Sequence, residues 1–366
     1  MMKEEIKVLM IVPSLRVSNG VASFSMGYYK KLNHDIVHMD FLSYAGYDSP
    51  YVHEIERNGD KVYFLSSFKD ITRYIRDCKK VLDNNYQIIH DNCLLKSIPM
   101  MKLAKQRVKN RILHAHSTKL GDNKINDQVN RFFLPVLLST INNRVACSTQ
   151  AGKAIFSNSS FEIIPNVINV EKFRYRDDVR RAVRKRESCA NKIIIGSVGR
   201  ITEAKNPFFA VDIIENIVKN HPNIEYWWIG NDRMNGKLDS YIRDKGIEKY
   251  IRLFGSRDDI SELYQAMDLF FLPSEFEGFG LACVEAQTAG LPCVVSNAFA
   301  REVDITGETV FIDLNDSKEK WINTIVKCMQ LTVDRSSAYR SAENSICSDA
   351  EAGERLYRYY SNIIKI

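Results

Sequence analysis

The stretch 193–207, IIIGSVGRITEAKNP, decides the fold of this chain. A run of apolar, β-branched residues predicts a buried strand, the loop behind it carries Arg200 and Lys205, and a helix is expected to begin near Pro207. A strand that leads into a helix in this way is the unit of a parallel α/β sheet. Ligands of such sheets gather at the carboxyl ends of the strands, which is where the two cations fall.

The same alternation of strand and helix patterns recurs in both halves of the chain. Short apolar runs predict strands in the first half at 7–12, 37–41, 61–64, 88–90, 111–114 and 144–147, and in the second half at 192–198, 224–229, 251–254, 269–272, 293–296 and 310–312. Helical patterns between these runs predict two doubly wound, Rossmann-like α/β domains with parallel sheets.

Chain length and the segment around Pro165 set the expected domain boundary. The 366 residues exceed one average domain of about 100 to 200 residues. Pro165 and Asn166 close a strand-like stretch, and a basic segment then leads to the next strand. We therefore expect an N-terminal domain at 1–168 and a second domain at 169–350. Apolar residues at helical spacing predict a terminal helix in 351–366 that packs back towards the first domain.

Composition excludes several classes of protein. The net charge of +6 is too small for a strong nucleic-acid footprint, but it suits anionic substrates. Basic residues cluster in 102–111 and 174–186, where we expect solvated helix faces. No segment approaches the roughly 18 apolar residues of a membrane helix, and the eight cysteines form no C-x-x-C pair. We expect a cytoplasmic protein with reduced thiols, and at most a peripheral contact with the inner face of the plasma membrane.

A second junction of strand and helix lies at 272–286 and contains two glycines. Gly278 and Gly280 let the backbone approach a ligand without interference from a Cβ atom. A helix N-terminus carries unsatisfied donors and a partial positive charge, which suits a pyrophosphate. The amides expected to bind it are those of Phe279, Gly280 and Leu281. Taken alone, the pattern equally fits an ordinary Gly-x-Gly turn before a helix.

Two carboxylates and two cations complete the predicted site. Glu277 stands before the turn and Glu285 about one turn inside the helix, so both can accept hydrogen bonds from hydroxyls of a sugar nucleotide. Arg200 can bind a diphosphate bidentately and Lys205 as a point charge. As isolated features, these residues would also fit a helix-dipole partner and surface cations. The third glycine of a dinucleotide fingerprint is missing after Gly199, which disfavours a nicotinamide dehydrogenase.

Together these segments resemble the retaining glycosyltransferases of family 4, which have the GT-B fold of two Rossmann-like domains facing a central cleft. The resemblance rests on the run from Val198 to Lys205, on Glu277 and Glu285 with seven residues between them, and on the segment 290–295. The sequences of segments 285–292 and 301–307 resemble those of the subgroup associated with capsular and exopolysaccharide synthesis.

The resemblance implies a role for each of these residues. Arg200 and Lys205 would bind the donor diphosphate and stabilise the leaving group. Glu277 would contact the donor sugar, and Glu285 the nucleotide ribose. The base would lie against the loop that ends another strand, which contains Gly255 and Arg257.

The first half contributes two further expected positions. The loop after the first strand matches a glycine-rich turn of the family, but it retains only Gly20, with Asn19 in place of a second glycine. Asparagine tolerates left-handed backbone, so the turn is expected to survive. His114 and His116 share one face of a strand, and His116 lies nearer its end. We select His116 as the catalytic histidine, which would bind the donor sugar or developing charge.

The residues and the resemblance predict a hexosyltransferase that uses a nucleotide diphosphate sugar, expected to be a UDP-sugar. The acceptor would be a saccharide or lipid-linked saccharide in capsular, exopolysaccharide or other cell-surface glycan synthesis. No cofactor and no obligatory metal are expected, because Arg200, Lys205 and the helix end supply positive charge. Two alternatives are a sugar-nucleotide epimerase of similar fold and a non-catalytic scaffold that binds nucleotide sugars.

Overall fold

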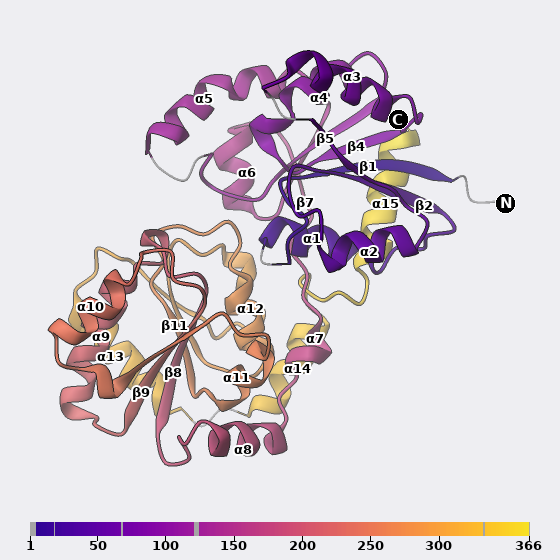
Figure 1. The fold of residues 1–366 in the computed structure, drawn as a ribbon. Helices are drawn as coiled ribbons and strands as arrows, with labels where there is room; N and C mark the ends of the chain where they lie inside the picture. The colour runs from indigo at the N-terminus through magenta and orange to yellow at the C-terminus, as the bar shows by residue number, and fades with distance from the viewer. Residues whose placement is uncertain (1–4, 18, 67–68, 121–123, 332–333, 366) are drawn as a thin grey trace. The chain divides into compact units, whose positions relative to one another are not determined.

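The computed structural model describes residues 5–17, 19–66, 69–120, 124–331 and 334–365, and for 124–126 it describes the backbone alone. The chain divides into two compact units (Figure 1). Unit 1 comprises residues 1–167 and 349–366, and unit 2 comprises residues 168–348. The C-terminal segment therefore belongs to the same unit as the N-terminus.

Unit 1 contains a parallel sheet whose described strands have the order β3-β2-β1-β4-β5-β6-β7. Figure 1 shows α3, α4 and α5 on one side of this sheet and α1, α2 and α15 on the other. The elements are β1 (Ile6–Val12), α1 (Gly20–Tyr29), β2 (Val37–Ser43), α2 (Pro50–Arg57), β3 (Val62–Phe64), α3 (Ile71–Leu82), β4 (Ile88–Asp91), α4 (Ile98–Ala104), β5 (Asn110–Ala115), α5 (Lys124–Leu138), β6 (Asn143–Ala146), α6 (Thr149–Phe156), β7 (Glu162–Ile163) and α15 (Ala352–Lys365).

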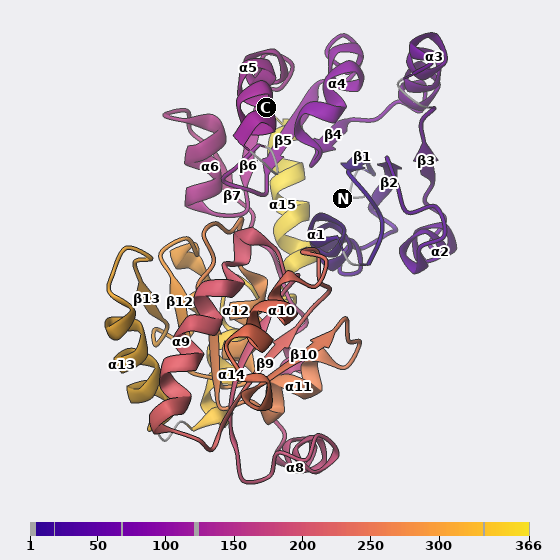
Figure 2. The same ribbon diagram turned by 60° about the vertical axis from the view of Figure 1, so that its left-hand side comes forward.

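Unit 2 contains a second parallel sheet, in which the described strands have the order β10-β9-β8-β11-β12-β13. Figure 2 shows this unit from another side, with α9 packed beside α13. The elements are α7 (Val170–Phe173), α8 (Asp177–Arg186), β8 (Ile193–Val198), α9 (Pro207–Asn220), β9 (Ile224–Ile229), α10 (Lys237–Asp244), β10 (Ile251–Gly255), α11 (Ile260–Ala266), β11 (Leu269–Leu272), α12 (Leu281–Thr288), β12 (Cys293–Ser296), β13 (Val310–Ile312), α13 (Lys318–Met329) and α14 (Arg335–Glu343).

The strand predictions are confirmed. Each of the twelve predicted runs is a strand whose ends differ from the prediction by at most two residues, and β7 adds a short edge strand. The central strands are enclosed on both faces, as in β9, whose residues are all buried, including Trp227 and Trp228. A strand covered on both faces reads as a continuous apolar run, which explains why the pattern was visible in the sequence. No helix in the described part of the chain is long and apolar enough to cross a membrane.

The helix α15 forms part of the core of unit 1. Its apolar face packs with α1 and the first strands through Leu356, Tyr360 and Ile363, all of which are buried. The hydroxyl of Tyr360 reaches the interior of the sheet, where it lies 2.8 Å from Nδ1 of His90 on β4. The last residues of the chain are thus a structural element of the N-terminal sheet.

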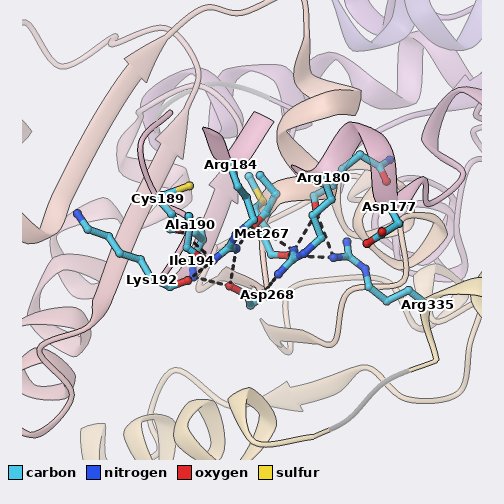
Figure 3. Close-up of polar contacts among 12 residues, drawn as sticks. Asp177, Arg180, Arg184, Cys189, Ala190, Lys192, Ile194, Met267, Asp268 and Arg335 are labelled. Carbon is cyan, nitrogen blue, oxygen red and sulfur yellow. Dashed lines mark hydrogen bonds and ion pairs between the residues drawn. The ribbon is translucent and has the colours of Figure 1, made fainter. Parts of the chain in front are cut away.

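The basic segment 174–186 is a solvated face, as predicted, at most of its basic positions, but Arg180 and Arg184 point into the structure. Figure 3 shows Arg180 and Arg184 of α8 in contact with Asp268 at the amino ends of β8 and β11, and Arg335 next to Arg180. Arg180 lies 2.5 Å and Arg184 3.1 Å from the Asp268 carboxylate, and Arg335 donates to the carbonyl oxygen of Met267 at 3.1 Å. These side chains satisfy carbonyl groups at the end of α11, so the basic cluster joins α8 and α14 to the sheet.

The close contact between α15 and the end of α1 allows a test of the fold. A Cβ atom on Gly353 would lie 1.8 Å from the carbonyl oxygen of Lys31, so Gly353→Ala must displace backbone. We expect it to lower the free energy of unfolding by about 1–3 kcal/mol in urea titrations followed by circular dichroism. Asn362→Ala, on the exposed face of the same helix, is the control. Equal midpoints for the two variants would contradict this packing.

Candidate active site

The candidate site of unit 2 lies where the strand order changes direction. β8 pairs with β9 on one side and with β11 on the other. The connections that follow β8 and β11 therefore lie on opposite faces of the sheet. The loops behind β8 and β11 meet there, because the amide of Glu275 donates to the carbonyl oxygen of Ala204 at 2.8 Å. Such a switch point is the usual ligand site of an open α/β sheet.

An ion pair joins the same two loops. Nζ of Lys205 contacts Oε1 of Glu277, and the Ser274 hydroxyl donates to the same oxygen at 2.8 Å. The Glu277 side chain is only 9% exposed and that of Lys205 22% exposed. Charges so far removed from water need a partner, so the pair holds both predicted residues in place.

Arg200 stands at the carboxyl end of β8 in a different environment. Its side chain is exposed, and no residue in the described part of the chain pairs with its guanidinium. It follows Gly199, whose carbonyl oxygen would lie 2.1 Å from a Cβ atom on Gly230, the residue that follows β9. The amide of Gly230 in turn donates to the carbonyl oxygen of Gly255 at 2.7 Å. Close backbone contacts therefore fix the strand end from which Arg200 projects.

The helix α12 presents its N-terminus at the same switch point. Gly278 lies in the preceding loop, and Gly280 is the N-cap residue with a φ of 104°. Phe279 is buried and anchors this turn. Within the described residues, the amides of Phe279, Gly280 and Leu281 donate no hydrogen bond to another group. Donors of this kind, together with the helix dipole, make the N-terminus an anion-binding element.

Glu285 lies on α12 with one carboxylate oxygen engaged. The Tyr264 hydroxyl of α11 is 3.1 Å from Oε2 of Glu285 and 3.0 Å from the carbonyl oxygen of Ala282. Burial raises the pKa of Glu285 to about 7, although the hydrogen bond from Tyr264 and the charge of Lys172 oppose the shift. A carboxylate kept in so apolar a place is typical of a functional position.

Arg257 is occupied by neighbouring carboxylates. Its Nε and Nη2 atoms each lie 2.7 Å from an oxygen of Asp259, and Nη2 also lies 3.6 Å from Glu187. The hydrogen bond to Asp259 raises the pKa of Arg257, so the guanidinium stays charged. Its role towards a nucleotide base, like that of Gly255, stays a prediction.

His116 belongs to unit 1, directly behind β5. Its Nε2 atom lies 2.8 Å from Oδ1 of Asn92, which follows the neighbouring strand β4. Its ring stacks on that of His114 with centroids 4.1 Å apart, and burial lowers the pKa of His116 to about 3. His114 is fully buried, so the structure places His116 nearer the surface than His114.

Gly20 also belongs to unit 1 and is the first residue of α1. The turn survives, but not through left-handed backbone at Asn19, because the φ of Asn19 is −97°. Its side chain instead accepts hydrogen bonds from the amides of Val21 and Ala22, both at 3.0 Å. The turn is thus maintained by an N-cap, which satisfies the free amides of the helix start.

Three residues that contact the predicted ones were not selected from the sequence. Asn92, Tyr264 and Ser274 are bonded to His116, Glu285 and Glu277 respectively. Asn92 and Ser274 come directly or soon behind predicted strands, which is a usable signal, whereas Tyr264 lies inside a helix and carries none. Across the described residues, no group of three or more His, Cys, Asp or Glu side chains is arranged to hold a metal ion.

The raised pKa of Glu285 predicts that this side chain lowers the free energy of unfolding at high pH. Because the folded value of about 7 exceeds the ordinary value of 4.5, the stabilising effect of the protonated carboxyl is complete below about pH 4.5 and is lost as the pH rises through 7. Glu285→Gln should therefore raise the melting temperature relative to the unmodified chain more at pH 8 than at pH 5. Glu308→Gln, at an exposed position, should show no such difference. Equal shifts at both pH values would refute the assignment.

The sequence resembles known glycosyltransferases. Residues 178–344 match the family described as glycosyl transferases group 1. The putative glycosyltransferase EpsF of Bacillus subtilis is 25% identical over 325 residues, which cover 84% of each chain. The capsular polysaccharide biosynthesis glycosyltransferase CapH of Staphylococcus aureus is 25% identical over 288 residues, 75% of this chain and 77% of that protein. A UDP-Gal:alpha-D-GlcNAc-diphosphoundecaprenol alpha-1,3-galactosyltransferase of Escherichia coli is 32% identical over 173 residues, 45% of this chain and 44% of that protein.

The fold has solved counterparts. The crystal structure of Anabaena HepE in complex with UDP and glucose has a TM-score of 0.80 and 17% identity, and it covers 98% of this chain and 100% of its own. At that identity the likeness establishes the fold, which confirms the prediction of two parallel-sheet domains of the GT-B type. Residues 178–344 thus resemble the glycosyl transferases group 1 family, and the chain is a glycosyltransferase.

Proposed function

We propose that the chain transfers a hexosyl group from a UDP-sugar to a saccharide or lipid-linked saccharide in the synthesis of a capsular, extracellular or other cell-surface polysaccharide, with retention at the anomeric carbon. The observation that carries the proposal is the meeting of the β8 and β11 loops at the switch point of unit 2. There Arg200, Lys205 and the N-terminus of α12 provide three sources of positive charge for a diphosphate.

These charges suit the chemistry of a leaving nucleotide diphosphate. Transfer breaks the bond between the anomeric carbon and a phosphate oxygen, so negative charge grows on the diphosphate as it leaves. Preorganised cations and backbone donors stabilise such charge most where it develops. We propose that Arg200, Lys205 and the amides behind Gly278 perform this task without an obligatory metal.

The carboxylates and the histidine suit a sugar and a ribose. Glu277 would accept hydrogen bonds from donor-sugar hydroxyls once the diphosphate attracts Lys205, and Glu285 would accept them from the ribose through the oxygen that Tyr264 does not occupy. His116, whose pKa is lowered to about 3, would be uncharged at neutral pH and would act by hydrogen bonding.

Relatives support the choice of donor and acceptor. HepE has been crystallised with UDP-glucose, and the E. coli relative is named for a UDP-Gal donor and a diphosphoundecaprenol-linked acceptor. CapH is named for capsular polysaccharide biosynthesis. A UDP-hexose donor and a saccharide carried on a lipid diphosphate are therefore the first substrates to test.

Arg200 offers a clean test of the anion site, because its exposed side chain supports no other contact in the described structure. Arg200→Ala should weaken UDP binding in calorimetric titration about tenfold or more, since it removes a charge-assisted hydrogen bond of about 1.5–3 kcal/mol. With UDP-glucose and UDP-galactose as donors, kcat should fall by about 10²-fold to 10³-fold. Arg340→Ala, an exposed arginine on α14, is the matched control. Unchanged UDP affinity would rule out the proposed role.

The reaction class is tested with the same donors. In the presence of a lipid diphosphate-linked saccharide, NMR of the product should show an anomeric configuration that matches the donor, and chelation with EDTA should leave the rate unchanged. Inversion or loss of activity in EDTA would overturn those parts of the proposal. Incubation of each donor without acceptor should yield no new sugar nucleotide, whereas an epimerase would produce one.

A further inference from the structure

The side-chain amide of Asn92 has only one orientation that its surroundings allow. Its Nδ2 atom lies 3.1 Å from the carbonyl oxygen of Ile11 and 3.2 Å from that of His90. Carbonyl oxygens accept hydrogen bonds and never donate them, so the nitrogen of the amide must face them. The other end of the amide, Oδ1, therefore points at His116, with 2.8 Å between Oδ1 and Nε2.

This orientation determines the tautomer of His116. An amide oxygen can only accept, so Nε2 of His116 must carry a hydrogen and donate it to Asn92. Burial lowers the pKa of His116 to about 3, which leaves the ring with a single nitrogen-bound hydrogen at neutral pH. The second nitrogen, Nδ1, then has a free lone pair. No described residue hydrogen-bonds to Nδ1. This atom is also not one of the buried polar atoms that lack a partner, so a ligand can reach it.

A column of buried rings holds His116 from behind. His114 stacks against it, and Phe24 of α1 contacts its ring with centroids 4.6 Å apart. Nδ1 of His114 lies 3.0 Å from Nε2 of His90, and Nδ1 of His90 lies 2.8 Å from the Tyr360 hydroxyl. This chain is consistent if Tyr360 donates to His90 and His90 donates to His114.

The column supplies no charge that would protonate His116. Burial lowers the pKa of both His90 and His114, so the titratable rings that face His116 are uncharged. The nearest carboxyl along β4, Asp91, is directed away, with its oxygens bonded to the Ser97 hydroxyl and the Cys93 amide. His114 Nε2 is buried near the Ile164 backbone and makes no hydrogen bond of good geometry.

We propose that Asn92 is a positioning residue that locks His116 in the tautomer with its hydrogen on Nε2, so that His116 meets the substrate as a hydrogen-bond acceptor through Nδ1. The partner on the substrate is then a hydroxyl group and not a phosphate or carbonyl oxygen, because only a hydroxyl can donate. The identity of the substrate rests on the proposed function. The tautomer itself does not.

The tautomer can be observed directly in the unmodified protein. Long-range ¹H–¹⁵N NMR spectra of histidine-labelled protein distinguish a protonated ring nitrogen from one with a lone pair, and loss of a signal in His116→Asn identifies the His116 ring. We expect a hydrogen on Nε2 and none on Nδ1 between pH 6 and 8. A hydrogen on Nδ1 would overturn the proposal. This outcome is independent of any activity, so it also stands if no UDP-sugar is turned over.

Substitution of Asn92 tests the positioning role. Asn92→Ala should produce a mixture of both tautomers and lower kcat with UDP-glucose about tenfold, while the Kd for UDP stays unchanged. The matched control is Asn142→Ala. The side-chain amide of Asn142 also hydrogen-bonds to backbone, since it accepts from the Arg111 amide and donates to the Lys109 carbonyl oxygen, but it lies at the amino end of β5. It should alter stability without altering tautomer or kcat. A single Nε2-protonated form in Asn92→Ala would refute the role.

Two replacements of His116 test the roles of its two ring nitrogens separately. The amide oxygen of asparagine can occupy the position of Nδ1, whereas glutamine reaches the position of Nε2 and can only preserve the bond to Asn92. His116→Asn should therefore retain more of kcat than His116→Gln. The reverse order would show that the donor nitrogen is the functional one, against the proposal.

Discussion

The ion pair between Lys205 and Glu277 is the contact on which the candidate site of unit 2 depends. The two residues are 72 positions apart in sequence, and they meet because β8 and β11 are neighbours in the sheet. Both charges are largely removed from water, so each requires the other, and the Ser274 hydroxyl fixes the carboxylate further. Cation and carboxylate are thereby held ready at the end of two central strands before any anion arrives.

Position along the strands distinguishes the two arginine groups of unit 2. Arg180, Arg184 and Arg335 gather at the amino ends of β8 and β11, where a carboxylate and carbonyl oxygens satisfy them. Arg200 stands at the carboxyl end of β8 and keeps its guanidinium in solvent. The first group contains more cations, but its hydrogen-bond donors are already used within the protein. Only Arg200 has donors left to bind a ligand.

In unit 1, neutral groups instead of charges hold the candidate site residue His116 in place. Buried rings from β4, β5 and α15 form a column behind His116, and the amide of Asn92 determines which nitrogen carries hydrogen. Because burial keeps these rings uncharged, the arrangement depends on hydrogen-bond direction and not on Coulomb attraction. The C-terminal helix takes part through Tyr360, which links the last residues of the chain to the interior of the first sheet.

Local patterns alone determined much of this protein. Central strands such as β9 are buried on both faces and are continuous apolar runs, and the partly buried strands β3, β10 and β13 are short apolar runs, so all twelve predicted strands and the helix start at Pro207 could be identified from the sequence. The candidate loops followed, since the ends of parallel strands share one edge. Hydrogen-bond partners could not be predicted in this way: Asn92 beside His116, Tyr264 beside Glu285 and the arginines around Asp268 come from different elements. Which side chains satisfy one another depends on strand order and helix packing, and only the tertiary structure sets these.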